Sequence, residues 1–257
     1  MIKPKTEVIQ LESRLGRVGS IQAYDPWDSR KSIQHAMWWV SKIARLSHGL
    51  GEAEDFEAHY DRVVNQMHHE SVLEFVPFLN FDGSGMLDTR EHLPAQSLRH
   101  CSTEYISTFT EMIQKESNTS PASAFLVEAP IFVARQWMRH RSFAYLEMSR
   151  RYTKGSRVPW EFYGVGEYAQ NIHPGELKTD AGFWNTCDLE YQRRLDAGWP
   201  NEIARGCMPV EAMTKFWTCG FDRDWEAFLK LRDDDHAQPE IRTFASWIST
   251  YLKEKVS

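Results

Sequence analysis

The chain is poor in cysteine and has no long apolar run. Its 257 residues include four cysteines without a Cys-x-x-Cys pair, namely Cys101, Cys187, Cys207 and Cys219. This scattering favours free thiols over a disulfide framework or a zinc site. No apolar stretch approaches the length of a transmembrane helix, and the first residues lack the apolar core of a signal peptide. We therefore expect a cytoplasmic protein that does not associate with membranes.

Positive charge is also scarce over the chain as a whole. The formal net charge is −6, whereas a general nucleic-acid binder usually carries a basic face. We therefore expect no nucleic-acid partner. The non-enzymatic alternative uses the one basic stretch, with Trp137, Phe143 and Tyr145 as base-stacking groups.

Metal-ligand patterns are equally sparse. Neither His-Glu-x-x-His nor another tightly spaced ligand motif occurs, so we expect no metal site. A metal hydrolase is the alternative, and its ligands would come from His68, His69, Glu70, Glu74 and the run Asp233 to His236. The Asp run is more often a solvated turn before a helix.

The remaining composition is that of a globular protein, with 42% hydrophobic and 26% charged residues. Apolar residues at helical spacing predict helices over about 29–46, 54–67, 180–197 and 224–231, and further helices that begin at Pro130, Pro200 and near Pro239. Strands are predicted at 73–81 and 124–127, and at most a short one before residue 28. This pattern predicts an α+β fold, with helices around a small mixed or antiparallel sheet. We expect one domain over 1–257 with a polar inserted segment at about 82–123.

The basic stretch runs from Ala129 to Tyr152 and continues to Arg157. Between Arg135 and Arg157 there are seven Lys or Arg residues and one acid, Glu147. Positive side chains this close together repel one another unless an anion lies between them. The planar guanidinium of arginine can bind two phosphate oxygens at once. On a helix that begins at Pro130, Arg135 pairs with Arg139, and Gln136 with His140, at i,i+4. The stretch predicts a pocket for a phosphorylated small molecule. The alternative is a solvated basic face.

Four motifs in order resemble the flavin-dependent thymidylate synthase family. The central one is Arg139-His140-Arg141, followed after seven residues by Ser149. Upstream lies His69-Glu70-Ser71-x-x-Glu74. Downstream lie Ala204-Arg205 with Met208-Pro209, and Leu231-Arg232 with the His236-Ala237-Gln238-x-Glu240 element. Arg-His-Arg alone would be weak, but the set spans most of the chain and is specific.

The resemblance implies a homotetramer of α+β subunits with FAD and the active sites at subunit interfaces. The implied reaction methylates C5 of the uracil in dUMP. Methylenetetrahydrofolate supplies the carbon, and NADPH supplies the hydride by way of the flavin.

The resemblance also assigns roles to single residues. Arg232 would stabilise negative charge on the uracil ring by preorganised electrostatics; otherwise it is an ordinary arginine at a helix C-terminus. Ser149 joins it in the catalytic set as a hydrogen-bonding hydroxyl, since no Gly-x-Ser-x-Gly elbow surrounds it. The substrate-binding set is Gln136, Arg139, Glu147, Ser149, Arg150, Arg151, Arg205 and Arg232. The FAD-binding set is Ser71, Arg139, His140, Arg141, Glu147, Arg223 and His236.

This chain departs from the family pattern near the expected flavin and sugar contacts. Ala144 and Leu146 stand where the family usually has hydrogen-bonding side chains, and Arg150 replaces a small residue. Phe221 and Ala227 stand where the family places amides. These changes raise two alternatives: a UMP or UMP/dUMP C5-methylase, as in nucleoside-antibiotic pathways, and a member that binds nucleotide without turning it over.

Overall fold

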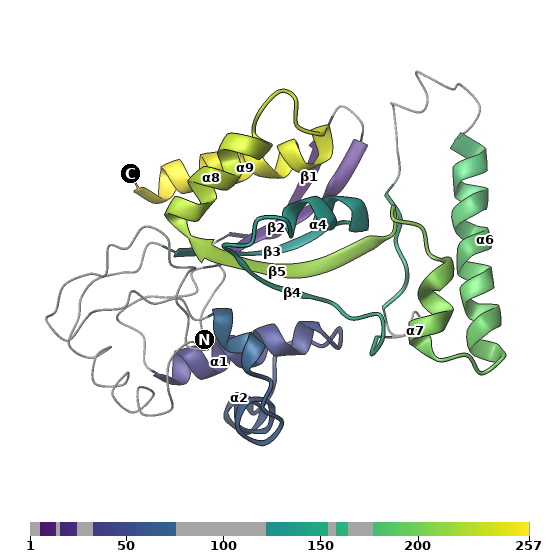
Figure 1. The fold of residues 1–257 in the computed structure, drawn as a ribbon, viewed down its shortest axis with the longest axis horizontal. Coiled ribbons are helices and arrows are strands. Elements are labelled where there is room, and N and C mark those ends of the chain that lie inside the picture. Colours follow the sequence, from purple (N-terminus) through teal and green to yellow (C-terminus); the bar gives the residue numbers. More distant parts are fainter. Residues whose placement is uncertain are drawn as a thin grey trace, which may run out of the picture.

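The fold is built on a five-stranded antiparallel sheet (Figure 1). The computed structural model describes residues 6–13, 16–24, 33–75, 122–153, 158–163 and 177–256. The strands are β1 (Ile9–Ser13), β2 (Gly16–Tyr24), β3 (Ala122–Pro130), β4 (Ala144–Glu147) and β5 (Met213–Phe221). Their order in the sheet is β1-β2-β3-β5-β4, and every pairing is antiparallel. The α+β prediction is therefore confirmed, with an antiparallel sheet.

The central strands are apolar on both faces because helices cover both sides of the sheet. Along β3, Phe125 and Val127 join one buried cluster, while Ala124 and Leu126 pack in the other. On β5, Phe216 and Trp217 divide in the same way. This alternation follows from the two-residue period of a strand.

The helices form one layer on each face of the sheet (Figure 1). One layer contains α1 (Ile33–Leu46), α2 (Phe56–Tyr60), the π-helical segment η1 (Asp61–Gln66) and the 3-10 helix η2 (Glu70–Phe75). The other layer contains α4 (Ile131–Trp137), α8 (Asp222–Arg232) and α9 (Pro239–Val256). Beside the sheet lie α6 (Leu177–Asp196), α7 (Asn201–Ala204) and the 3-10 helix η4 (Arg205–Cys207).

Most predicted helices are confirmed within the described residues. Helix α1 fills the described part of the segment predicted over 29–46, and α8 and α9 match their predictions closely. The helix predicted over 54–67 is α2 continued by η1. Gly198 ends α6 in the left-handed conformation, with φ +80°, as its position predicted. Pro200 is the N-cap of α7.

The strand predicted at 73–81 is wrong over its described part. Residues 70–75 form η2 instead, and 76–81 lie outside the described residues. Here Val72, Leu73 and Phe75 are buried in the cluster beneath α1, and the Trp39 indole donates to the Phe75 carbonyl at 2.9 Å. The carbonyl is thus satisfied by a side chain rather than by a neighbouring strand.

Several strands were not predicted. The N-terminal hairpin has two strands, β1 and β2, where at most one was expected. Strands β4 and β5 were missed altogether. Strand β3 is longer than predicted and begins at Ala122, so the last two residues of the expected insertion belong to the sheet. Residues 82–121 lie outside the described residues, and the single-domain organisation stays a prediction.

Cys187, Cys207 and Cys219 form no disulfide, as predicted, and Cys101 lies outside the described residues. Within the described ranges, no helix combines the length and apolar character needed to cross a bilayer.

Gly220 is required by close packing under the sheet. A Cβ at this position would lie 2.2 Å from the Phe143 ring, which stacks on Trp225 at a centroid distance of 4.2 Å. Gly220→Ala should therefore lower the free energy of unfolding by about 2 kcal/mol, because both rings are held by the core.

The matched control is Gly182→Ala on α6, where an added Cβ meets nothing within 4 Å. This change should stabilise the protein by about 0.5 to 1 kcal/mol, because alanine favours a helix interior. Urea unfolding at equal protein concentration measures both effects. Equal shifts for the two variants would refute this explanation of Gly220.

Candidate functional site

Helix α4 is short, and it is anchored by the segment that precedes β5. The backbone N–H groups of Ile131 and Phe132 donate to the carbonyls of Ala212 (3.0 Å) and Val210 (3.1 Å). Pro130, predicted to be the first helical residue, is instead the N-cap of α4 and the last residue of β3. Two free N–H groups of the first turn are thereby satisfied.

The chain leaves the helix much earlier than predicted. Helix α4 ends at Trp137, so Arg139 and His140 lie in a turn, and the predicted i,i+4 pairs do not form. The Tyr145 hydroxyl on β4 lies 2.8 Å from the Trp137 carbonyl and 2.9 Å from the His140 carbonyl. The Tyr145 hydroxyl thus supplies a hydrogen bond to the carbonyls at and just after the end of α4. The backbone can therefore leave the helix and turn back into β4.

Arg232 is fixed against the end of α4. Its Nε donates to Nε2 of His140 at 3.0 Å, and its Nη2 donates to the Gln136 carbonyl at 3.1 Å. Gln136 also donates through its side chain to Gln238. Arg232 therefore donates to a carbonyl of the neighbouring helix α4. The two hydrogen bonds hold the half-buried Arg232 guanidinium in one orientation.

His140 is held in its neutral form at this contact. Burial lowers the pKa of His140, and the positive charge of Arg232 lowers it further. A neutral imidazole can accept the Arg232 hydrogen bond at Nε2. Phe228 packs edge-on against the ring at a centroid distance of 4.8 Å. We call Gln136, His140, Arg232 and Gln238 the Arg232 group.

A cavity of about 650 Å³ lies on the other side of α4, between β4, β5 and α7. We call it the large cavity. Its polar wall carries three guanidinium groups and two carboxylates, together with hydroxyls and an indole. These side chains belong to Arg135, Glu147, Ser149, Arg150, Trp160, Glu202, Arg205 and Thr214.

Hydrogen bonds hold the groups at the centre of this wall. Thr214 Oγ1 donates to Glu147 Oε1 at 2.6 Å, so β5 orients the carboxylate on β4. The Ser149 hydroxyl accepts from the backbone N–H of Arg151 at 3.3 Å, and the Ser149 carbonyl accepts from Thr153 N at 2.9 Å. Ser149 therefore caps a turn and does not lie on a helix.

The turn of residues 149–153 is held from two further sides. Ser149 N donates to the Ser47 carbonyl at the end of α1 at 3.1 Å. Asn201 of α7 donates to the Arg151 carbonyl at 3.2 Å. The Arg151 guanidinium is 58% exposed and lies 4.0 Å from Glu202, a weak surface pair. The turn thus presents Ser149 and Arg151 next to α7 and Arg205.

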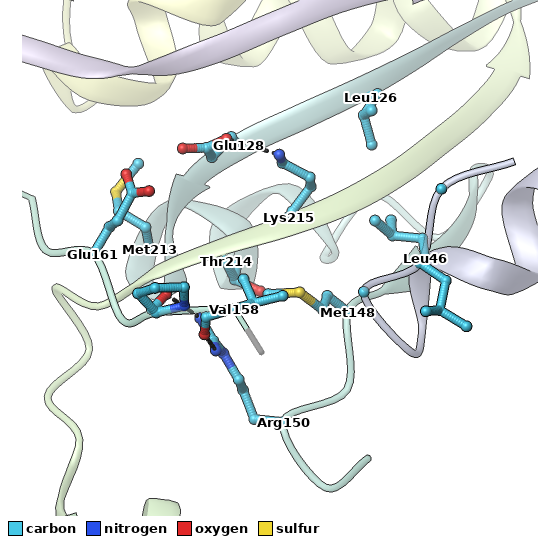
Figure 2. Close-up of a pocket in the computed structure, with 14 residues that line it drawn as sticks. Leu46, Leu126, Glu128, Met148, Arg150, Val158, Glu161, Met213, Thr214 and Lys215 are labelled. Atoms are coloured by element: carbon cyan, nitrogen blue, oxygen red, sulfur yellow. Dashed lines mark hydrogen bonds and ion pairs between the residues drawn. The ribbon is translucent and has the colours of Figure 1, made fainter. Parts of the chain in front are cut away.

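A smaller cavity of about 320 Å³ adjoins the large one, and we call it the small cavity (Figure 2). Both cavities share Met148, Arg150, Met213 and Thr214 as lining residues. Figure 2 shows Glu161 and Met213 at one end of the small cavity and Leu46 at the other, with Arg150 below them. Above them Lys215 and Glu128 form an ion pair at 3.0 Å.

The predicted site residues thus fall into two groups within one chain. Glu147, Ser149, Arg150 and Arg205 line the large cavity, and Arg151 lies beside it. Gln136, His140 and Arg232 form the second group, and Arg232 does not line the large cavity.

Four other predicted residues lie at the surface. Arg139 and Arg141 are exposed in the turns after α4, and Ser71 is exposed on η2. His236 is 97% exposed and contacts Asp234 at 2.8 Å. Arg223 belongs to α8, and its side chain lies outside what the structure describes.

Four residues of the polar wall were not in the predicted set. Arg135 was counted in the basic stretch but given no role, and its place in that stretch was the available signal. The sequence did not indicate a site role for Trp160, Glu202 or Thr214. Thr214 lies on the unpredicted strand β5, and the other two reach the cavity only through tertiary packing.

Several residues that depart from the family pattern lie within the described part of the chain. Phe221 is 3% exposed at the end of β5, and Leu146 packs against the buried cluster beneath α1. Ala227 lies exposed on α8. Leu146 and Phe221 thus serve the packing of the sheet.

Within the described ranges, no three His, Cys, Asp or Glu side chains gather where they could hold one metal ion. Decisive information on the class of protein comes from related sequences. The family model described as "Thymidylate synthase complementing protein" matches residues 88–256. The chain belongs to the flavin-dependent thymidylate synthase family.

Individual relatives agree with this membership. A flavin-dependent thymidylate synthase of Thermotoga neapolitana is 37% identical over 153 residues, which are 56% of this chain and 69% of the relative. One from Thermus thermophilus is 31% identical over 162 residues, with 57% of this chain and 59% of the relative covered. The expected family, enzyme class and flavin dependence are thus confirmed, and the metal hydrolase alternative is set aside.

Among solved structures, the chain is similar to the UMP/dUMP methylase PolB from Streptomyces cacaoi bound with 5-Br UMP. The identity is 29%, the TM-score is 0.43, and 52% of this chain and 68% of that chain are covered. Family membership rests on the sequence matches and not on this superposition.

Removal of the Arg232 charge should raise the pKa of His140. Arg232→Gln eliminates the second cause of its lowered pKa and leaves burial, so the value should move toward 6.5 without reaching it. A buried neutral histidine costs stability as the pH falls below 6.5, since the unfolded chain then binds more protons. The variant should therefore lose less stability than the wild type over that range.

Histidine ring titration by NMR measures this shift. His59 is the internal control, because its pKa is lowered by burial and by Arg45, Arg62 and His48 instead. An unchanged His140 titration in the variant would contradict the assigned contact.

Proposed function

We propose that the protein converts dUMP to dTMP at a site built from the large cavity and the Arg232 group. Carbon would come from methylenetetrahydrofolate, whose methylene replaces the hydrogen on C5 of uracil. NADPH would supply the hydride that completes the methyl group, by way of the flavin. The observation that carries the proposal is the convergence of Glu147, Ser149 and Arg205 on one cavity in a chain of this family.

The large cavity suits the phosphate and sugar of a nucleotide. Its volume of about 650 Å³ falls in the usual range for small-molecule pockets. Arg135 and Arg205 can grip phosphate oxygens in the bidentate manner of guanidinium groups. Glu147, held by Thr214, offers acceptor oxygens for sugar hydroxyls or ring N–H groups.

Arg232 suits the uracil ring. Carbon–carbon bond formation at C5 is favoured when negative charge is stabilised at N3 and O4 of the ring. A guanidinium held at the end of α4 by two hydrogen bonds does not need to reorganise when that charge develops. The neutral His140 supports it without adding a competing positive charge.

The residues expected to hold FAD suit a dinucleotide. Arg139 and Arg141 are exposed cations in the turns after α4, where they can pair with a diphosphate. Ser71, His140, Glu147, Arg223 and His236 complete the proposed set. A bound flavin would supply a two-electron carrier for the hydride. The protein's part is to hold that carrier close to the nucleotide and to exclude water.

We place the complete site between subunits of a homotetramer. The large cavity and the Arg232 group lie on different sides of α4 in one chain, so one copy can bring its cavity to the Arg232 group of another. Large apolar side chains are also exposed on α6, at Phe183 (53%) and Leu189 (62%), and at or just before α7, at Trp199 (42%) and Ile203 (54%). Patches of this kind mark association surfaces.

Turnover of dUMP and UMP in parallel tests the proposed function. Purified protein with FAD, methylenetetrahydrofolate and NADPH should show a flavin spectrum that NADPH bleaches without oxygen, and should convert dUMP to dTMP. A preference for UMP would replace this substrate with the alternative raised by Leu146 and Phe221. Binding of dUMP without turnover would identify a non-catalytic member, and neither binding nor turnover would refute the proposal.

Mixed variants test the shared site. Arg205→Ala should mainly weaken nucleotide binding, as should Arg139→Ala, whereas Arg232→Ala should abolish methylation. If one site takes Arg205 and Arg232 from different copies, subunits of the two variants can combine into intact sites, measured at a dUMP concentration too low for Arg205→Ala to turn over. Random mixing should then restore about a quarter of wild-type activity.

The control is each variant mixed with itself under the same dissociation and reassembly conditions, which should restore nothing. An inactive mixture that has formed mixed tetramers would show that both arginines act within one chain.

A further inference from the structure

Arg150 directs its positive charge into the protein rather than into the large cavity. The residue is 7% exposed, and its two terminal nitrogens donate to the carbonyls of Val158 and of Pro159, the latter at 3.2 Å. The guanidinium carbon lies 3.9 Å from the centroid of the Trp160 ring, in a cation–π contact. Arg150 therefore grips three consecutive residues of the 158–160 segment.

These contacts join two separate pieces of the substrate pocket. On one side, Arg150 is part of the 149–153 turn that presents Ser149 and Arg151. On the other side, the 158–163 segment is tied to the sheet, because Met213 N donates to the Glu161 carbonyl at 2.7 Å. The Arg150 side chain thus fixes the turn relative to β5.

The 158–163 segment is also anchored to the opposite layer of the fold. The Tyr163 hydroxyl donates to Glu240 of α9 at 2.9 Å, and Glu240 is buried. The segment is therefore a firm support, and a side chain clamped to it acquires a fixed position.

Arg150 also forms part of the wall between the two cavities, because it lines both of them. A small residue at this place would remove that part of the wall and let the large cavity open toward the small one. Burial lowers the pKa of Arg150, which shows the cost of placing a guanidinium there. That cost is offset by two carbonyls and an aromatic face, together with the nearby negative charge of Glu161.

We propose that Arg150 is a positioning residue, which clamps the nucleotide-binding turn to residues 158–160 and closes the rear wall of the large cavity. This inference rests on the proposed function for its effect on the nucleotide. It differs from the expectation that Arg150 itself contacts the substrate, since each of its terminal nitrogens already donates to a backbone carbonyl and its planar face lies on Trp160.

A lysine substitution separates the two roles. Lys binds phosphate well as a point charge but lacks the planar fork that reaches two carbonyls and stacks on an indole. If Arg150 is a clamp, Arg150→Lys and Arg150→Ala should raise the dissociation constant for dUMP similarly, by roughly tenfold. If Arg150 instead contacts the phosphate, Arg150→Lys should retain nearly wild-type affinity, and the proposal is overturned.

Amide hydrogen exchange without nucleotide gives a second readout that needs no activity. Loss of the clamp should speed exchange of Tyr152 and Thr153, whose N–H groups are bonded within the turn. The same increase is expected in Arg150→Lys and Arg150→Ala. Unchanged exchange in both variants would contradict a clamp.

The matched control is Arg62→Ala, which removes an exposed arginine on η1 that lines neither cavity. It should leave both dUMP affinity and exchange in the turn unchanged. Failure of the proposed function would appear as absent dUMP binding in the wild type. Failure of the clamp would appear only as a difference between the lysine and alanine variants, or as unchanged exchange.

Discussion

Strand β5 is the element on which both halves of the candidate site depend. It pairs with β3 over its whole length and with β4 on the other side, and it is buried on both faces. Near its beginning, Thr214 orients Glu147 in the large cavity. At its end it continues directly into α8, whose last residue is Arg232. The sheet therefore fixes where the two groups lie relative to each other.

The sequence predicted the helices well because their signals are local. Apolar residues at helical spacing indicated α1, α8 and α9, and Pro130, Gly198 and Pro200 marked helix boundaries through their backbone restrictions. Strand β5 gave no such signal. With apolar residues on both faces it lacks the alternation of a half-buried strand. Strand β4 was not predicted because the helix was expected to continue through it. The helix ends early where the Tyr145 hydroxyl bonds the Trp137 and His140 carbonyls, and the spacing of apolar residues does not reveal these bonds.

The family motifs indicated candidate site residues, but they did not indicate how the fold groups them. Spacing placed Arg135 and Arg139 on one helix face, whereas the helix ends between them. Arg205 reaches the large cavity only because α7 packs beside the 149–153 turn. Arg150 shows the limit most clearly, because its sequence position suggested a substrate-binding residue, whereas packing directs its charge toward Trp160. Motifs indicate which residue types the chemistry requires, and tertiary contacts decide which of them face the ligand.

The central claim is that separate guanidinium groups converge on one pyrimidine nucleotide beside a flavin. A crystal structure of the protein with FAD and dUMP tests it most directly. The account predicts the phosphate within hydrogen-bonding distance of Ser149 and Arg205, and the uracil ring beside Arg232 from another copy of the chain. A nucleotide bound in a cavity that none of these residues lines would contradict it.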